Sequence, residues 1–487
     1  MSEFSQLLTD YVHRKNVRIY SLAEYCGIDR SLMYKIIHGK RMPSSASAVD
    51  KISEFLQLTP AEHRELHTTF RISLEGRNNY YRRLDILDFL DHFRDIITPG
   101  ISPAPSPVFH SSDCPNIPLS TFTEVRQATY MVLSTLTTDA HPHLRLMLPP
   151  KSWFISRLLS PLMDQKCSAS IDHIMCLNNS EQVTRENQNY NLHCLRDILP
   201  LCICGCNYHP YFYYDNIDSR LDSFQLFPYL ILTDKYAVLI SDDFEKGLLT
   251  HQSDLLQLFQ DLFSGYLSQA RPLLKTITSV AEQLKFVREF VVSEQGTEYF
   301  FQMIPCMTHL LTEKFLKKYL HPELPEKELF IRNVLNHISD LEQRLEEKTL
   351  INIFSEDGIE DFLRTGIFEE YPRNIYLQPA LEDRLDIIRR FTDQCRAGIL
   401  HIKMLRHSIG TVKNGANIYI TPKAGYLLFT PIDSSSPVYL SIQESGLTAA
   451  FWDFFQSMDE SLFYTTEEAI LKLEELIQRY QKGAIRN

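Results

Sequence analysis

The spacing of apolar and polar residues over Leu22–Arg41 predicts two helices joined by a tight turn. Gly27 stands at the turn, where a left-handed backbone conformation costs glycine least. Asp29 is a good N-cap for the second helix, because its carboxylate can accept hydrogen bonds from the free amides two and three residues on. The residues that recur at helical spacing and predict the buried face of this helix are Leu32, Ile36 and Ile37.

The other face of the second helix is polar and basic. Its side chains, with those that follow Gly39, are Arg30, Ser31, Tyr34, Lys35, His38, Lys40 and Arg41. Four Lys or Arg residues and no Asp or Glu lie in this stretch. A positively charged helix face of this kind is typical of a helix that enters the DNA major groove. The alternative is a helix pair that serves only protein contacts.

The pattern S-L-A-E-x-x-G-I-x-x-S-x-x-x-x-I-x-x-G at residues 21–39 resembles the lambda-repressor/Cro-like helix-turn-helix domain, or XRE family. The resemblance covers roughly residues 2–72 and implies an all-α five-helix bundle whose third helix is the recognition helix. It places the helices at Glu3–Lys15, Tyr20–Cys26, Arg30–Gly39, Ala46–Leu56 and Pro60–Arg71. It also implies that base contacts come from Arg30, Ser31, Tyr34 and Lys35, and phosphate contacts from His38, Lys40 and Arg41. One such domain covers a half-site, so we expect a homodimer on double-stranded DNA.

Charge separates this module from the rest of the chain. The 487 residues carry a net charge of −12, and a chain of this length is expected to form several domains. Residues 1–72 hold ten Lys or Arg and eight Asp or Glu, a net charge of +2. The acidic remainder is poorly suited to bind nucleic acid, so we expect it to have another role.

The sequence favours a bacterial cytoplasmic protein. No apolar run reaches the length of a membrane span, and the polar first segment argues against a secretory leader. Ten cysteines in a long charged chain are typical of reduced thiols rather than of a disulfide framework. We therefore expect no membrane partner.

Beyond the DNA-binding module (1–76), residues 77–107 are expected to form a helix and a proline-rich linker. Four prolines in Pro99–Pro107 exclude a helix there. The preceding segment, about 78–98, has an apolar stripe that could form a coiled coil but is better explained by packing on the body. The stripe consists of Ile86, Leu90, Phe93 and Ile97.

The rest of the chain reads as a large α+β body, which makes the whole protein a multidomain α+β chain. We expect two lobes, at 108–275 and 380–487, joined by a helical connector at 276–379. Each lobe shows a helix before a strand, then a β-hairpin, then an aromatic helix. This order arises either by internal duplication or by chance.

A cysteine- and histidine-rich stretch is the one candidate metal or thiol site. Its members are His193, Cys194, Cys202, Cys204, Cys206 and His209. The C-x-C-x-C spacing lacks the C-x-x-C turn that wraps zinc. We therefore interpret it as a buried strand that uses cysteine as a small apolar residue, with metal or thiol sensing as the alternative.

No catalytic motif stands out, so we expect no enzyme, no cofactor and no bound metal. His401-Ile402-Lys403 begins like a phospholipase D-type motif, but Ser408 stands where that motif needs aspartate, so a plain strand is expected. The aromatic run at 207–215 could line a ligand pocket but is more typical of a strand at the core. The chain is predicted to be a DNA-binding regulator whose body senses a small molecule or peptide or mediates assembly. A DNA-recruited enzyme of unrecognised class is the other alternative.

Overall fold

The computed structural model describes residues 2–98, 114–136, 141–150, 169–179, 189–203, 207–215, 226–277, 282, 285, 297–347, 349–412, 415–431, 434 and 436–484. The chain forms two compact units. The first, the N-terminal unit, comprises Met1–Asp85 and Glu181–Asn189, and the second comprises Ile86–Ser180 and Tyr190–Asn487.

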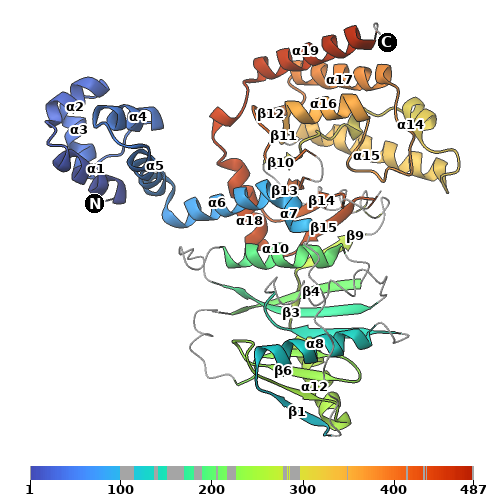
Figure 1. Cartoon of the computed structure of the whole chain (residues 1–487). Helices are drawn as coiled ribbons and strands as arrows, with labels where there is room; N and C mark the ends of the chain where they lie inside the picture. The colour runs from blue at the N-terminus through green and yellow to red at the C-terminus, as the bar shows by residue number, and fades with distance from the viewer. Residues whose placement is uncertain are drawn as a thin grey trace. The chain divides into compact units, whose positions relative to one another are not determined.

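The N-terminal unit is built from the five predicted helices, labelled in Figure 1. They are α1 (Glu3–Arg14), α2 (Ile19–Cys26), α3 (Arg30–Ile37), α4 (Ala46–Phe55) and α5 (Pro60–Glu75). Helix starts follow from local caps: Asp29 caps α3, and Thr59 with Glu62 forms a capping box on α5. The helices enclose a core of their own that includes Phe4, Leu8, Leu22, Ile36, Val49, Ile52 and Leu66.

One predicted core position of α3 is wrong. Leu32 is 40% exposed, whereas Met33 is fully buried with Ile36 and Ile37. The buried stripe of α3 runs through residues 33, 36 and 37, so Leu32 lies at the edge of this stripe, where its side chain meets solvent. The exposed face of α3 is therefore less polar than predicted.

The helix expected over 78–98 is broken at His92 into α6 (Arg77–Asp91) and α7 (Phe93–Ile97). Its apolar stripe packs on the body, as predicted. The ring of Phe89 lies 5.7 Å from that of Phe451, and the ring of Phe93 lies 5.2 Å from that of Phe429. The proline-rich linker at 99–107 lies outside the described residues.

The second unit contains two mixed β-sheets. The strand order of the first sheet is β1-β7-β6-β5-β2-β3-β4-β8, and that of the second is β12-β11-β10-β13-β14-β15-β9. The first sheet comprises β1 (Asn116–Leu119), β2 (His143–Met147), β3 (Ser170–Asn178), β4 (Asn207–Asp215), β5 (Tyr229–Leu232), β6 (Ala237–Ile240), β7 (Gly247–Thr250) and β8 (Arg271–Pro272). The second comprises β9 (Leu274–Ile277), β10 (Glu298–Phe301), β11 (Leu350–Ser355), β12 (His401–Leu405), β13 (Asn417–Ile420), β14 (Gly425–Phe429) and β15 (Val438–Ile442).

Apart from β8, which pairs with β4 at the edge of the first sheet, the two sheets share one topology. In each sheet, three neighbouring parallel strands (β2-β3-β4 and β10-β11-β12) follow one another from the middle of the sheet toward one edge. An antiparallel meander (β5-β6-β7 and β13-β14-β15) continues from the other side of the first parallel strand. The strand that precedes each set, β1 or β9, pairs with the last meander strand. This repeated plan favours internal duplication over chance.

The shared topology corrects two details of the predicted lobes. The region 276–379, predicted as a mainly helical connector, also supplies β10 and β11 to the second sheet, so it is part of that lobe. In addition, the order of elements in the sequence predicts that the strand at 400–405 corresponds to the strand at 143–148, which is β2. In the structure that strand, β12, corresponds to β4, because β4 and β12 are each the outermost of three parallel strands. Both errors arise because strand order depends on contacts between segments distant in sequence, which local patterns do not report.

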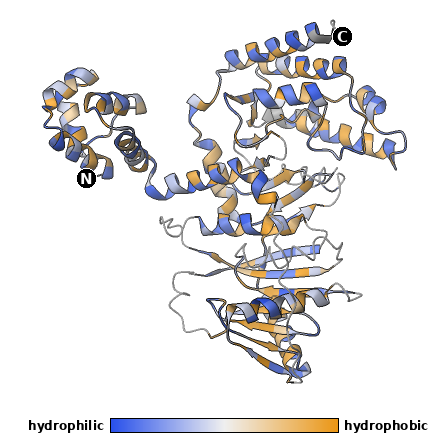
Figure 2. Cartoon of the chain, in the orientation of Figure 1, coloured by the Kyte–Doolittle hydropathy of each residue, from blue (hydrophilic) through white to orange (hydrophobic). Residues whose placement is uncertain are grey.

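Helices lie beside both sheets (Figure 1), and hydrophobic positions recur along the strands and the helices (Figure 2). Their buried side chains form shared cores. The bounds of the helices are α8 (Phe122–Thr135), α10 (Tyr190–Cys202), α12 (Ser253–Leu267), α14 (Glu313–Tyr319), α15 (Lys327–Glu347), α16 (Glu356–Thr365), α17 (Leu381–Arg396), α18 (Ser445–Gln456) and α19 (Thr466–Ala484), with short 3₁₀ turns η1 (Thr308–Leu310) and η2 (Glu460–Leu462). One core contains residues from both sheets and from α7, α8, α10 and α18. A second core joins β11 and β12 to α14–α17 and α19. No helix among the described residues is long and apolar enough to cross a bilayer.

Candidate nucleic-acid interface and a polar cavity

The start of α3 is fixed by backbone and cap geometry. Gly27 adopts φ +66°, and the next amide, that of Ile28, donates to the carbonyl oxygen of Ala23 at 3.0 Å. The Asp29 carboxylate then accepts from the amides of Ser31 at 2.8 Å and Leu32 at 3.1 Å. These contacts set the angle between α2 and α3, as a helix-turn-helix requires.

The predicted base-contacting residues all lie on α3, and all of them are exposed. Ser31, Tyr34, Lys35 and His38 are spaced three and four residues apart, so they share one helix face. The rings of Tyr34 and His38 stack with centroids 3.9 Å apart, and His38 Nδ1 lies 3.0 Å from the Tyr34 carbonyl oxygen. The two rings therefore offer a flat surface to a base or sugar, and Arg30 lies at the N-terminal end of the same helix.

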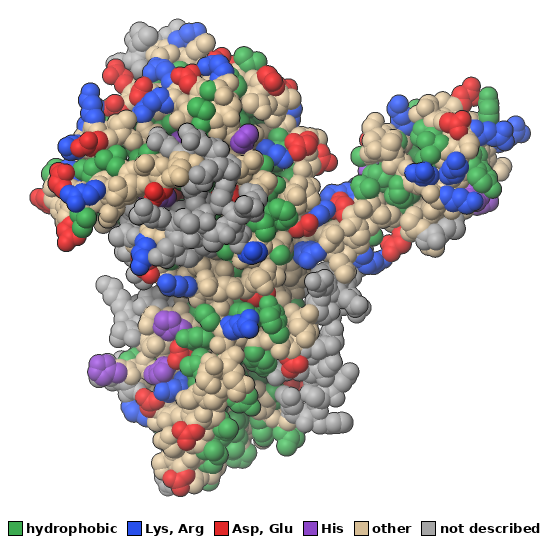
Figure 3. All heavy atoms as spheres, turned by 180° about the vertical axis from the view of Figure 1, so that it is seen from behind, with side chains coloured by type: hydrophobic (Ala, Val, Ile, Leu, Met, Phe, Trp, Pro, Cys, Tyr) green, Lys and Arg blue, Asp and Glu red, His purple; other side chains and the backbone are tan. Residues whose placement is uncertain are grey.

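The cationic side chains of this segment are held close to α3 yet free to bind anions. Gly39 adopts φ +70°, and the amides of Lys40 and Arg41 both donate to the carbonyl oxygen of Lys35, at 2.8 and 3.2 Å. Within the described part of the chain, no ion pair involves Arg30, Lys35, Lys40 or Arg41. Figure 3 shows Lys and Arg side chains on the surface of the N-terminal unit.

Two further features of this unit were not predicted from the sequence. The Thr9 hydroxyl on α1 donates to the Ile37 carbonyl oxygen at 2.9 Å and so anchors the end of α3. The first turn of α2 has no side-chain cap, and Arg18 and Tyr20 are exposed there. Free amides beside a cation suit a phosphate. Arg18, a basic residue two positions before the predicted start of this helix, was the sequence signal that could have indicated a phosphate site.

The cysteine- and histidine-rich stretch does not form the predicted strand at its start. Cys202 ends α10, because the apolar periodicity of that helix continues to this residue. Burial raises the pKa of Cys202 to about 12 and holds that of Cys194 still higher, so both thiols stay protonated and unreactive. Cys204 and Cys206 lie outside the described residues. The described members (His193, Cys194, Cys202 and His209) do not form a group of metal ligands.

Two other predicted strands are confirmed. The aromatic run forms β4, whose Tyr208 and Phe212 are buried in the core. The Tyr208 hydroxyl lies 2.8 Å from Nδ1 of the buried His173, whose pKa burial lowers to about 4. The H-x-K segment forms β12, where Lys403 pairs with Glu460 at 2.7 Å.

A polar cavity lies in the second lobe at the carboxyl end of β10. Its volume is about 180 Å³, and it is bounded by Ile304, just after β10, and by Asn417, the first residue of β13. After β10 the chain adds β11 and β12 on one side of that strand and then β13 on its other side, so the order of strands changes direction between β10 and β13. Ligands of open α/β sheets bind at such a switch point. The polar side chains that line the cavity are Asp361, Thr365, Glu369, Arg373, Asn417 and Thr430.

Glu369 is a cavity-lining carboxyl group with a raised pKa. Burial, the largest cause, and the neighbouring Glu370 carboxyl together raise its pKa to about 8, against a hydrogen bond with Asn417 that lowers it. Burial also raises the pKa of Glu370, which accepts from Gln302 Nε2 at 3.2 Å. Near neutral pH the Glu369 carboxyl is therefore largely protonated and can donate a hydrogen bond to a ligand. No local sequence signal indicated this residue.

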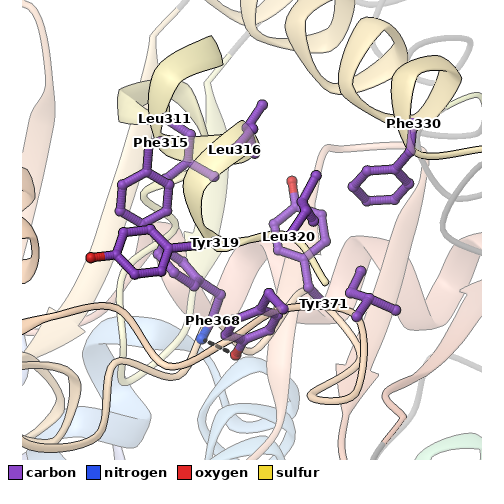
Figure 4. Close-up of a pocket in the computed structure, with 10 residues that line it drawn as sticks. Leu311, Phe315, Leu316, Tyr319, Leu320, Phe330, Phe368 and Tyr371 are labelled. Carbon is purple, nitrogen blue, oxygen red and sulfur yellow. Dashed lines mark hydrogen bonds between the residues drawn. The ribbon is translucent and has the colours of Figure 1, made fainter. Parts of the chain in front are cut away.

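A neighbouring pocket is too small to act as a binding site. It is lined by aromatic and aliphatic side chains such as Phe315, Tyr319 and Phe330 (Figure 4). Its volume is about 20 Å³, close to the room needed for one water molecule. Phe368 and Tyr371 line both this pocket and the polar cavity, and the Phe368 amide donates to the Tyr376 hydroxyl at 2.9 Å. The small pocket therefore belongs to the packed wall of the larger one.

Comparison with known proteins identifies the N-terminal unit. No curated protein matches the chain. Among solved structures, phosphatidylserine synthase from Haemophilus influenzae Rd KW20 has a TM-score of 0.23 and 10% identity over 76% of this chain and 94% of that chain. The archaeal chromatin protein TrmBL2 has a TM-score of 0.21 and 10% identity over 50% of this chain and 84% of that chain. TM-scores this low support no argument about the body. Residues 8–63, in contrast, match the family model of the Cro/C1-type HTH DNA-binding domain, so this part of the N-terminal unit is a helix-turn-helix DNA-binding domain.

Proposed function

We propose that this chain is a bacterial, cytoplasmic transcription regulator that binds specific DNA sequences as a homodimer and responds to a small molecule bound by its body. The observation that carries the proposal is the exposed face of α3 within a Cro/C1-type domain. That face combines hydrogen-bonding and aromatic side chains with cations that form no ion pair with another described residue. Base readout and phosphate attraction need these two properties together.

A homodimer follows from the size of the DNA-binding domain. One recognition helix contacts only a few base pairs, and a second copy one helical turn away doubles the contacted sequence. The acidic body is the part of the chain that would supply the dimer contact, because like charge keeps it away from the DNA backbone. In this proposal the body regulates and has no catalytic role.

The polar cavity supports the sensory part of the proposal. A protonated Glu369, the Asn417 amide and the Thr365 and Thr430 hydroxyls offer both donors and acceptors, while Arg373 offers a cation. This set suits a small molecule rich in hydrogen-bonding groups. Apolar walls from Ile304, Ile367 and Phe368 would exclude water around it.

Selection of binding sites from random duplexes by the full chain tests the DNA-binding part. We expect a palindromic consensus, and Arg30→Ala should weaken binding to it by about 1–3 kcal/mol with relaxed preference at one base pair. A chain that enriches no sequence would contradict sequence-specific binding. For the sensory part, thermal-shift screening of small metabolites should find a ligand whose effect is lost in Asn417→Ala.

A further inference from the structure

We infer that Asp50, His63 and His67 form a zinc site on the N-terminal unit. His63 and His67 lie four residues apart on α5, so their side chains share one face, and their ring centroids are 4.5 Å apart. Asp50 reaches the same place from α4. The inference is independent of the proposed regulatory function.

The distances bring one ligand atom from each residue together. His67 Nε2 lies 2.8 Å from Asp50 Oδ1, and His63 Nε2 lies 3.8 Å from the same oxygen. The three ligand atoms all fall within 4.8 Å of one another. An ion about 2.0–2.2 Å from each of these atoms requires only small side-chain adjustments. Among the described residues this is the one group of three such side chains.

A buried hydroxyl orients one of the imidazoles. Ser53 Oγ lies 2.7 Å from His63 Nδ1, and Ser53 is only 4% exposed. Ser53 follows Asp50 by three residues on α4, so the two side chains face α5 together. When Nδ1 donates to this hydroxyl, the lone pair of Nε2 is left free for a metal. Such an outer contact commonly accompanies metal-binding histidines.

The ligand set selects the metal. Two imidazoles and one carboxylate suit zinc and its neighbours in the transition series, whereas calcium and magnesium prefer oxygen ligands alone. Three protein ligands leave a fourth tetrahedral position for water. The side chains of His63, Asp50 and His67 are 41%, 57% and 23% exposed, so an ion can enter from solvent.

Binding would tie α4 to α5. Both helices contribute to the core of the DNA-binding domain, but none of the three ligands lies on α2 or α3. The metal is therefore expected to stabilise the domain without touching DNA. Its effect on stability follows from binding the folded state alone, since the unfolded chain does not hold Asp50 near the two histidines.

Titration of the metal-free full chain tests the inference. Zn²⁺ is followed by calorimetry, and Co²⁺ by its visible absorption. We expect one bound equivalent to be lost in Asp50→Asn and in His67→Ala, and Ser53→Ala to weaken that equivalent by about 10–100-fold. His92→Ala is the matched control, because His92 pairs with Asp88 at 3.0 Å and no third ligand joins them among the residues that the structure describes. It should leave the stoichiometry unchanged.

Other cysteines and histidines remain in every variant and could bind zinc elsewhere. The test is therefore the difference in zinc stoichiometry and affinity between each variant and the wild type. Equal stoichiometry and dissociation constant in wild type, Asp50→Asn and His67→Ala would overturn the site. Circular dichroism checks that each variant is folded. If His67→Ala unfolds the domain, Asp50→Asn decides alone, because it changes one atom of an exposed side chain.

Discussion

The backbone of Gly358 lies against that of Met303, so that a Cβ at Gly358 would fall 1.7 Å from the Met303 carbonyl oxygen. Gly358 is in the first turn of α16, and Met303 follows β10. This close approach holds α16 on the second sheet beside the polar cavity, whose wall includes Ile304 and Asp361. The absence of a side chain at one residue thus helps to shape the candidate ligand site.

Gly358→Ala is expected to destabilise the second unit by more than about 3 kcal/mol, because two backbones must separate to admit the methyl group. Denaturant unfolding measures the effect. Gly265→Ala is the matched control: it lies within α12, and an added Cβ there meets nothing within 4 Å. Alanine should stabilise that helix by up to about 1 kcal/mol. Equal stability of the two variants would contradict the packing described for α16.

Removal of the N-cap in Asp29→Ala should destabilise the N-terminal unit by about 1 kcal/mol, because the amides of Ser31 and Leu32 lose their acceptor. Thermal unfolding measures this change. Asp29→Ser restores an acceptor and should recover most of the loss. Recovery of DNA binding along with stability would show that the cap acts by ordering α3.

The resemblance to the lambda-repressor/Cro-like family predicted the five helices α1–α5. Local signals marked the turn at Gly27 and the N-cap at Asp29, because a cap acts on residues next to it in the chain. The polar cavity could not be predicted in this way. Glu369 and Asn417 come from distant segments that meet only through the strand order of the second sheet. The HxxxH spacing of His63 and His67 was visible in the sequence, but its partner Asp50 depends on how α4 packs on α5.

Lys40→Ala should weaken binding to every DNA sequence alike, because Lys40 is predicted to neutralise a phosphate rather than to contact a base. The slope of log affinity against log salt should fall by about one unit. Fluorescence anisotropy at several salt concentrations measures both effects. A loss of preference at a single base pair would instead assign Lys40 to base readout.

The pKa of Glu369, raised to about 8, predicts a pH dependence of stability. Between its ordinary value of 4.5 and about 8 the folded state binds a proton that the unfolded chain has released. The contribution of Glu369 to stability is therefore fully present below pH 4.5 and is lost as the pH rises through 8. Glu369→Gln, which does not titrate, should remove this decline. Unfolding of both proteins between pH 5 and 9 tests the assignment, and parallel curves would refute it.

The N-terminal helices should fold without the body. Residues 1–76 contain the whole core of the five-helix bundle and end at Gly76, whose amide donates to the Ile72 carbonyl oxygen at 2.9 Å. A module with its own core is expected to fold alone. We predict a helical monomer that binds DNA weakly, whereas the full chain binds far more tightly because dimerisation presents the second domain at high local concentration. Sedimentation and DNA titration of both proteins measure this. A dimeric fragment with full affinity would show that the dimer contact lies in the DNA-binding domain and not in the acidic body.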